Sequence, residues 1–379
     1  MSNIDQYELQ IPDNQQEDED DLNTSISFKE SVVMNADWTI ETIDNQIRKG
    51  NIDLQPSFQR RGAWDDKRKS RLIESIIVGM PVPNIVLAEQ KDHRGRFIVI
   101  DGKQRLMAIN EFLADDFKLK GLDIRPELNG QKYSELPSED REYLDNSTLR
   151  STVIRSWQDE NFLYAIFYRL NSGSLPLSPQ ELRKALIGGK LLDEIETYLS
   201  QSNQFHALFG QSLDKRMRDS ELVLRFIAYN KRVEEYRGNF KEFLDEIVEF
   251  YEKGWLNYQQ EVVDALNSLN LALDTTVQIF GDNSFKKWLG TKYERVINRA
   301  IFDCIARFFS DPNVSQAALQ NASAVEDAFK DLCMDQDYRD SVEKTPKTTF
   351  ATHTRIDMWG RSLAHVLGMQ YDGNTRRIL

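Results

Sequence analysis

The chain has 379 residues, of which 40% are hydrophobic and 29% are charged, with two cysteines and a formal net charge of −13. This composition is typical of an ordinary soluble globular protein that is long enough for two domains. Two cysteines exclude a disulfide framework, and no apolar run approaches the roughly 18 residues of a membrane span, so we expect a cytoplasmic protein with no membrane partner.

The negative charge is concentrated in the first 22 residues, which hold eight Asp or Glu and no Lys or Arg and leave −5 for the rest of the chain. Low hydrophobicity with a run of like charge predicts an acidic, disordered tail over residues 1–30. A second interpretation, a tail that mimics the charge of DNA and competes for a basic groove, stays open. Because the body is only mildly acidic, any contact with DNA must come from a local basic patch.

Residues 31–190 alternate short β patterns with helical patterns. In chain order we expect a helix ending near Gly50, an extended segment at 51–54, a helix at 64–78, a hairpin of strands 84–89 and 97–100, and a helix under way by residue 106. The apolar face of the helix at 64–78 is formed by Leu72, Ile73, Ile76 and Ile77. Residues 161–170 are apolar and aromatic, and periodicity does not decide between a strand and a buried helix.

The segment that begins at Ser178 is a well-formed helix start. Ser178 is suited to cap the helix, Pro179 to occupy its first position, and Glu181 to complete a capping box. Residues 191–309 show helical spacing almost throughout. We therefore predict an α+β fold class, with one domain over residues 31–190 and an all-helical C-terminal domain over residues 191–379.

The strongest chemical motif joins a buried strand to a helix through Asp101-Gly102-Lys103-Gln104-Arg105. Backbone amides and the positive dipole end of such a helix suit a phosphate, and Gly102 permits a close approach of the backbone. Arg105 can clamp a phosphate, and Asp101 can hold a divalent cation or orient a water. The simpler interpretation, which composition alone favours, is a charged loop in which Asp101 caps the helix and pairs with Arg105.

A second motif, Pro-Ser-Phe-Gln-Arg-Arg-Gly-Ala-Trp over residues 56–64, opens a stretch with six basic residues within twelve positions. Basic residues flanked by aromatic ones can hold the phosphates of a nucleotide or a nucleic acid. For residues 67–71 a solvated helix face is favoured over phosphate binding. For Gln59 and Arg60, a solvated surface and phosphate binding are equally supported. A third motif, Phe-Tyr-Arg-Leu-Asn-Ser-Gly over residues 167–173, is by itself only a polar turn.

Several motifs are absent from the sequence. The four histidines and two cysteines have no ligand spacing that would support a zinc site. There is no Gly-rich loop of the Walker type, which argues against a Walker-type ATPase. No HNH nuclease pattern is visible either.

Taken together and in this order, the three motifs resemble the N-terminal domain of the GmrSD-type restriction proteins, over roughly residues 35–230. The resemblance implies a ParB/sulfiredoxin-like fold, a role in DNA restriction or anti-phage defence, and nucleotide binding and hydrolysis tied to an Asp-Gly-Gln-Gln-Arg motif. It implies that Asp101, Gln104 and Arg105 are catalytic and that Asp101 is the candidate ligand of Mg²⁺. It further implies that the nucleoside triphosphate is bound by Gln59, Arg60, Gly102, Lys103, Asn171 and Gly173.

Two departures from the family pattern affect these expectations. Lys103 stands where the family has its first Gln, so a phosphate donor is kept but an amide that positions water is lost. No HNH nuclease domain is visible after the helical region, so we expect either that a separate nuclease chain cuts DNA or that there is no cutting activity. We expect a nucleotide-binding and NTP-hydrolysing protein of DNA restriction or defence. The alternative is a non-catalytic nucleic-acid-binding module or a partner-docking subunit.

Overall fold

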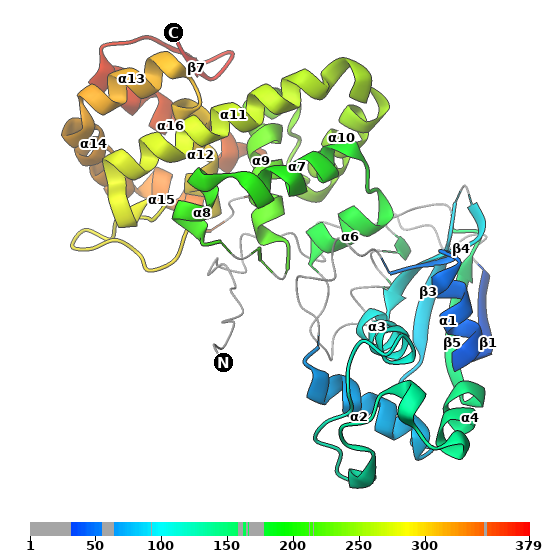
Figure 1. Cartoon of the computed structure of the whole chain (residues 1–379). Coiled ribbons are helices and arrows are strands. Elements are labelled where there is room, and N and C mark those ends of the chain that lie inside the picture. Colours follow the sequence, from blue (N-terminus) through cyan, green and yellow to red (C-terminus); the bar gives the residue numbers. More distant parts are fainter. Residues whose placement is uncertain are drawn as a thin grey trace. The chain divides into compact units, whose positions relative to one another are not determined.

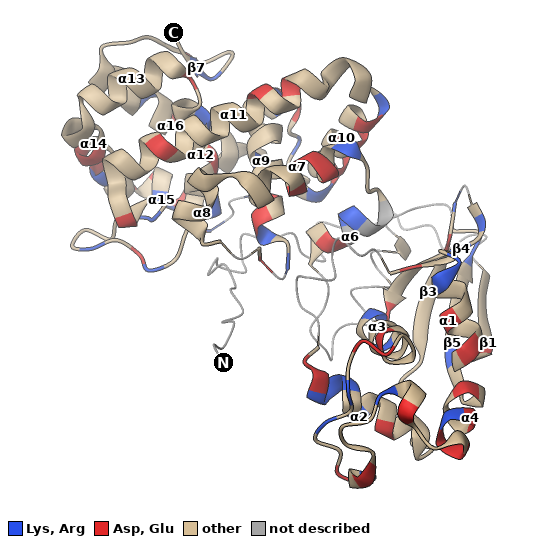
Figure 2. Cartoon of the chain, in the orientation of Figure 1, with Lys and Arg blue, Asp and Glu red and all other residues tan. Residues whose placement is uncertain are grey.

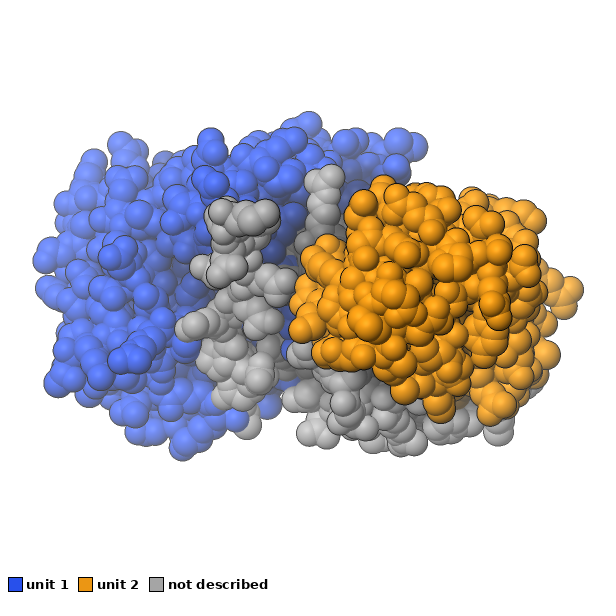
Figure 3. All heavy atoms as spheres, turned by 60° about the horizontal axis from the view of Figure 1, so that its bottom comes forward, with its two compact units in different colours: residues 1–21, 178–379 blue, residues 22–177 orange. Residues whose placement is uncertain are grey.

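The computed structural model describes residues 32–54, 64–91, 93–157, 162–163, 166, 178–211, 213–214, 216–344 and 347–379. These residues divide into two compact units, which we call the sheet unit (within residues 22–177) and the helical unit (within residues 178–379; Figure 3). A mixed α/β region followed by a helical one confirms the predicted fold class. The division falls before helix α6 (Pro179–Leu186), whereas the sequence pattern placed the domain boundary after residue 190.

The sheet unit is built on five strands in the order β1-β5-β3-β4-β2. Their bounds are β1 (Val32–Thr39), β2 (Ile52–Asp53), β3 (Ile85–Gln90), β4 (His93–Asp101) and β5 (Thr148–Arg155). Strand β5 runs antiparallel to β1 and parallel to β3, while β4 runs antiparallel to β3 and parallel to β2. The end of β4 therefore lies beside the start of β3, with Asp101 opposite Val86.

In the described part of the sheet unit the α-helices with assigned bounds are α1 (Ile40–Arg48), α2 (Asp66–Ile77), α3 (Lys103–Leu113) and α4 (Ser138–Asn146). Apolar side chains of the first three helices form one core with Leu87 of β3 and Val99 of β4, and Figure 1 shows the helices gathered against the sheet. The four residues predicted to form the apolar face of α2 are all buried. The hairpin of β3 and β4 is also confirmed, whereas β1 and β5 were not predicted.

The helical unit confirms the predicted all-helical region, apart from one short ribbon at its end. Its long helices are α6, α7 (Lys190–Gln201), α8 (Asn203–Phe209), α9 (Arg218–Arg232), α10 (Phe240–Lys253), α11 (Trp255–Phe280), α12 (Arg299–Phe309), α13 (Pro312–Gln320), α14 (Ala322–Met334), α15 (Gln336–Glu343) and α16 (Thr349–Leu367). The ribbon pairs β6 (Tyr371–Asp372) with β7 (Arg377–Ile378). None of the helices in the described part of the chain combines the length and the low charge needed to cross a bilayer.

Charged side chains from α9, α12 and α16 are buried together, and we call Glu221, Arg225, Arg299, Asp303 and Arg355 the buried ionic cluster. Arg225 donates from Nε and Nη2 to the two carboxylate oxygens of Asp303, at 3.0 and 2.5 Å. Arg355 Nη2 lies 3.7 Å from the same carboxylate. Charges buried at this depth need their partners, because water does not solvate them.

The two cysteines, Cys304 and Cys333, are free and buried in the helical unit. Burial raises the pKa of each thiol to about 12. Because the thiolate is the reactive form, neither side chain serves as a nucleophile near neutral pH.

Candidate functional site

The connection between β4 and α3 is the centre of the candidate site. Gly102 stands between the last residue of β4 and the first residue of α3, with φ 95° and ψ 10°. A Cβ at this position would lie 2.5 Å from Cγ2 of Ile85 and 3.1 Å from Nη2 of Arg105. The turn therefore requires glycine both for its left-handed backbone and for its close contacts.

This turn also sets where α3 begins. The helix starts at Lys103, directly after the strand, and Gly102 provides no side chain to cap it. Asp101 consequently does not cap the helix, which corrects the simpler sequence interpretation on this point. The first-turn amides of α3 point toward the end of β4, and this end of a helix favours an anion.

Arg105 and Asp101 form an ion pair across this turn, as the sequence interpretation expected. Nη2 of Arg105 lies 2.7 Å from Oδ2 of Asp101, and it also donates to the backbone carbonyl of Asn84 at 3.4 Å. The Arg105 side chain is 13% exposed and that of Asp101 is 31% exposed, so both reach solvent. Nε of Arg105 is buried and has no hydrogen-bond partner among the described residues.

Gln104 links this turn to the end of the second sequence motif. Its Oε1 accepts a hydrogen bond from the backbone N–H of Trp64 at 3.0 Å. The Trp64 ring in turn lies under the guanidinium of Arg68, 4.7 Å from the ring centroid. The described structure thus gives Gln104 a positioning contact, which the sequence did not predict.

We expect the Gln104 contact to protect the Trp64 amide from hydrogen exchange. Replacing Gln104 by alanine removes the acceptor and is expected to speed exchange of that amide about fivefold, since such a bond contributes about 1 kcal/mol. Gln104→Glu keeps an acceptor and is expected to keep the protection. Hydrogen–deuterium exchange read at Trp64 measures both variants, and equal protection in wild type and Gln104→Ala would contradict the assignment.

A row of hydrogen-bonded polar side chains continues from Arg105 across the sheet. Beyond the carbonyl of Asn84, its side-chain Nδ2 donates to Oγ1 of Thr152 on β5 at 3.2 Å. That hydroxyl donates to Oδ1 of Asn35 on β1 at 3.3 Å. Sequence analysis did not single out these residues, because their positions on neighbouring strands follow from a strand order that local patterns do not reveal.

The remaining predicted site residues are placed as follows. Lys103 is half-buried in the first turn of α3. Gln59, Arg60, Asn171 and Gly173 lie outside the described residues, as does most of the segment 161–170. The predicted proximity of these four residues to Asp101 therefore stays a prediction.

The basic residues at 67–71 belong to a paired surface of α2, as the sequence interpretation favoured. Lys69 Nζ lies 2.5 Å from Oε2 of Glu111, and Arg71 Nη2 lies 2.9 Å from Oδ2 of Asp123. Arg68 is engaged with the Trp64 ring. Since these cations already have partners, they are poor candidates for a phosphate site.

Downstream of the third motif, the predicted helix start is confirmed. Oγ of Ser178 accepts from the Glu181 amide, and the Glu181 carboxylate accepts from the Ser178 amide at 2.6 Å. Two residues after Glu181, Arg183 is fully buried and donates from Nε to Oδ1 of Asp245 at 2.6 Å. These residues hold the helical unit together internally.

No metal centre is evident in the described part of the chain, where no three His, Cys, Asp or Glu side chains gather closely enough to hold an ion. Asp101 is a single carboxylate beside a guanidinium. A lone carboxylate is compatible with Mg²⁺ only where phosphate oxygens and waters complete the octahedron.

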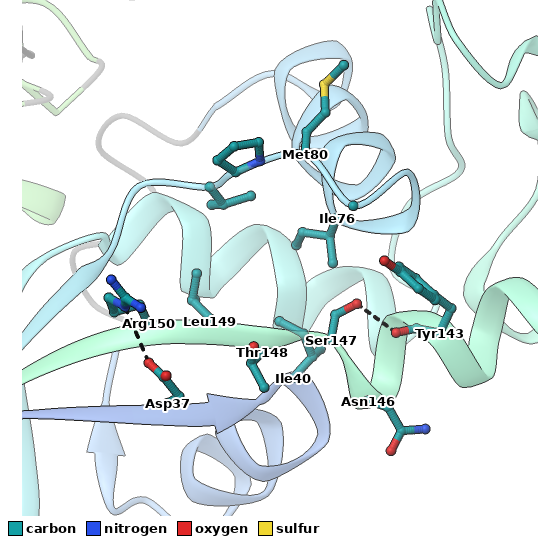
Figure 4. A pocket seen from close by; sticks show the side chains of 13 residues that line it. Asp37, Ile40, Ile76, Met80, Tyr143, Asn146, Ser147, Thr148, Leu149 and Arg150 are labelled. Atoms are coloured by element: carbon teal, nitrogen blue, oxygen red, sulfur yellow. Dashed lines mark hydrogen bonds and ion pairs between the residues drawn. The ribbon is translucent and has the colours of Figure 1, made fainter.

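A pocket of about 500 Å³ lies elsewhere in the sheet unit (Figure 4). Its apolar lining comes from Ile40, Ile76 and Leu149, and Arg150 and Asp37 form an ion pair of 3.6 Å at one end. None of residues 101–105 lines this pocket. It is assembled from three separate stretches of the chain, residues 37–40, 76–82 and 143–150, so no local sequence pattern predicts it.

Comparison with known families gives one match. Residues 40–188 match the model described as "GmrSD restriction endonuclease, N-terminal domain". Searches among curated proteins and among solved structures returned no significant match, so the likeness to a ParB/sulfiredoxin fold stays a prediction. The match includes the β4–α3 turn with Asp101, Gly102 and Arg105, and agrees with the resemblance seen in the motifs. Residues 40–188 of this chain therefore form a domain of the GmrSD N-terminal family.

Proposed function

We propose that the β4–α3 turn binds the phosphates of a nucleoside triphosphate and that the chain hydrolyses it. The family match indicates a role in restriction or defence, and the proposal adds the chemistry of this turn. The observation that carries it is the arrangement of Arg105 on a left-handed glycine turn at a helix start. The hydrogen bonds of Arg105 to described residues use Nη2 alone, and its buried Nε has no hydrogen-bond partner among them.

The residues of the turn have different proposed roles in hydrolysis of a triphosphate. The first-turn amides of α3 and the Arg105 guanidinium offset negative phosphate charge, which grows on the bridging oxygen as the bond to the terminal phosphorus breaks. Asp101 holds Arg105 in place and orients a water for attack on that phosphorus. The products are a nucleoside diphosphate and inorganic phosphate, and the proton of the water passes to solvent or to phosphate.

Mg²⁺ is part of this proposal as the usual companion of a nucleoside triphosphate. It supplies charge neutralisation across the phosphates. Asp101 is the residue of this chain proposed to contact it, with the other ligands coming from phosphate oxygens and water. Gln59, Arg60, Lys103, Asn171 and Gly173 are proposed as further nucleotide contacts on the basis of the family resemblance. DNA and a separate nuclease chain are the proposed partners.

The experiment is phosphate release from ATP, GTP, CTP and UTP with Mg²⁺, with and without DNA. We expect turnover in the wild type and a loss of at least about a hundredfold in each of two variants. Asp101→Ala removes the group that orients the water, and Arg105→Ala removes the cation that offsets phosphate charge. Arg71→Ala is the matched control, since Arg71 is an exposed arginine of the same unit paired with Asp123.

Two results would contradict this proposal. Turnover that survives in both site variants would place hydrolysis elsewhere in the chain. Absence of turnover with every nucleotide, for a wild type that melts cooperatively, would contradict hydrolysis by this chain. Nucleotide-induced thermal stabilisation, compared between wild type and Arg105→Ala, then tests binding separately.

A further inference from the structure

The outer half of the β3–β4 hairpin is exposed, although its inner half is buried. In β4, residues 97–100 are buried in the sheet, whereas residues 93–96 are all exposed. Strand β3 has the same division, since Ile85–Ala88 are buried and Glu89 and Gln90 are half-buried. The end of this hairpin therefore contributes little to the core of the sheet unit.

A bulge lies in this exposed part. Gln90 pairs with His93, but the preceding residue, Glu89, pairs with Phe97. Arg94, Gly95 and Arg96 are consequently extra residues on β4, and Gly95 has φ 81°. A bulge of this kind redirects side chains away from the ladder and needs a residue that accepts a left-handed backbone.

The acidic side chain of Glu89, on the β3 side of the bulge, supports the bulge. Oε1 of Glu89 accepts a hydrogen bond from the Gly95 amide at 2.9 Å, and Oε2 lies 3.7 Å from Nε of Arg155. The Glu89 side chain is only 15% exposed. The Glu89 carboxylate therefore contacts the Gly95 amide and Arg155, and it forms no ion pair with Arg94 or Arg96.

Arg94 and Arg96 form no ion pair with any residue that the structure describes. Six other arginines of the sheet unit each form an ion pair with a described carboxylate. The pairs are Arg48 with Asp44, Arg71 with Asp123, Arg105 with Asp101, Arg125 with Asp140, Arg150 with Asp37 and Arg155 with Glu89. Figure 2 shows Lys and Arg coloured blue along this end of the hairpin. In a chain whose body is acidic, two neighbouring exposed arginines with no ion-pair partner among the described residues form a local basic patch.

We propose that this bulged hairpin, through Arg94 and Arg96, binds the phosphate backbone of duplex DNA. Guanidinium groups donate two parallel hydrogen bonds to a phosphate, and a two-stranded ribbon has the width of a DNA groove. Gly95 between the arginines has no side chain to obstruct the approach of a backbone. A restriction role, which the family match indicates, makes DNA the polyanion to expect in place of an acidic protein.

This inference rests on the restriction part of the proposed function and is independent of nucleotide turnover. Binding is therefore measured without any nucleotide, so that failure of hydrolysis and failure of DNA binding are separate results. The probe is a fluorescently labelled duplex of mixed sequence, titrated with the full chain over a series of salt concentrations. The variants are Arg94→Ala/Arg96→Ala, Arg94→Lys/Arg96→Lys and the control Arg71→Ala.

We expect the double alanine variant to bind at least about tenfold more weakly at low salt. The slope of log K against log salt is expected to become less negative by about 1.8, since each phosphate contact contributes roughly 0.9. The double lysine variant keeps the charges and is expected to keep the slope, with weaker binding because it lacks paired donors. Arg71→Ala is expected to match the wild type.

Three results would overturn the proposal. These are a wild type that does not bind the duplex, a double alanine variant with wild-type melting and an unchanged salt slope, and an Arg71→Ala variant that loses as much slope as the hairpin variant. Poly-glutamate is the competing probe. If it bound in a hairpin-dependent manner while DNA did not, the hairpin would be assigned to an acidic protein and the proposal would be rejected.

Discussion

Replacing Asp303 by asparagine is expected to lower the free energy of unfolding of the helical unit by about 3–5 kcal/mol. Asp303 is buried at the centre of the buried ionic cluster, where it accepts two hydrogen bonds from Arg225 and lies beside Arg355. The substitution keeps the shape of the side chain and removes its charge. Two buried guanidinium groups then lose their nearest anion, and neither is able to deprotonate near neutral pH.

Denaturant unfolding followed by circular dichroism measures this loss. Asp331→Asn is the matched control, because Asp331 is an exposed residue of α14 and its charge is solvated. That variant is expected to change stability by less than about 0.5 kcal/mol. If Asp303→Asn unfolded at the same denaturant concentration as the control, the cluster would not have the energetic role that its burial implies.

Replacing Gly102 by alanine is expected to weaken nucleotide binding at the β4–α3 turn. A left-handed backbone costs alanine about 1 kcal/mol, and here the added Cβ also meets Ile85 at 2.5 Å and Arg105 at 3.1 Å. Either the turn or the guanidinium must move, and both hold the proposed phosphate position. We expect a loss of affinity of at least about tenfold, with a modest decrease in the melting temperature of the sheet unit.

Gly50 provides the matched control for this prediction. It also has a positive φ, of 69°, but a Cβ there would meet nothing within 4 Å. Gly50→Ala therefore introduces the backbone strain without the clash and is expected to bind nucleotide like the wild type. Calorimetric titration with nucleotide compares the two variants. Equal affinity in Gly102→Ala and Gly50→Ala would show that the close packing of the turn is irrelevant to binding.

Features that depend on a few consecutive residues were predicted well from the sequence. The capping box of Ser178 and Glu181 is an example, because both partners lie within one helical turn. The pairing of Asp101 with Arg105 is another, since residues four apart face each other at a helix start. The apolar face of α2 follows from helical periodicity in the same way.

Features that depend on distant residues were not predicted. The contact between Gln104 and the Trp64 amide joins residues 40 positions apart. Strand β1 gave no period-two signal, since its first four residues are all exposed. In β5, Thr148, Arg150 and Thr152 are exposed or half-buried and alternate with buried residues. One of the buried residues, Ser151, is polar, so the sequence shows no clear alternation of apolar and polar residues. The β3–β4 hairpin was predicted but its basic surface was not, because the sequence does not show which acids pair with which cations.

The position of β5 in the sheet has a consequence for synthesis of the chain. Strand β1 has β5 as its partner, with Val32 opposite Arg155, and β3 also pairs with β5. At a translation rate of 5–20 residues per second, β1 waits on the order of ten seconds before β5 leaves the ribosome. During that interval its exposed Val32, Val33 and Met34 are open to other nascent chains, so we infer that slow elongation ahead of residue 155 raises the burden on chaperones for this protein.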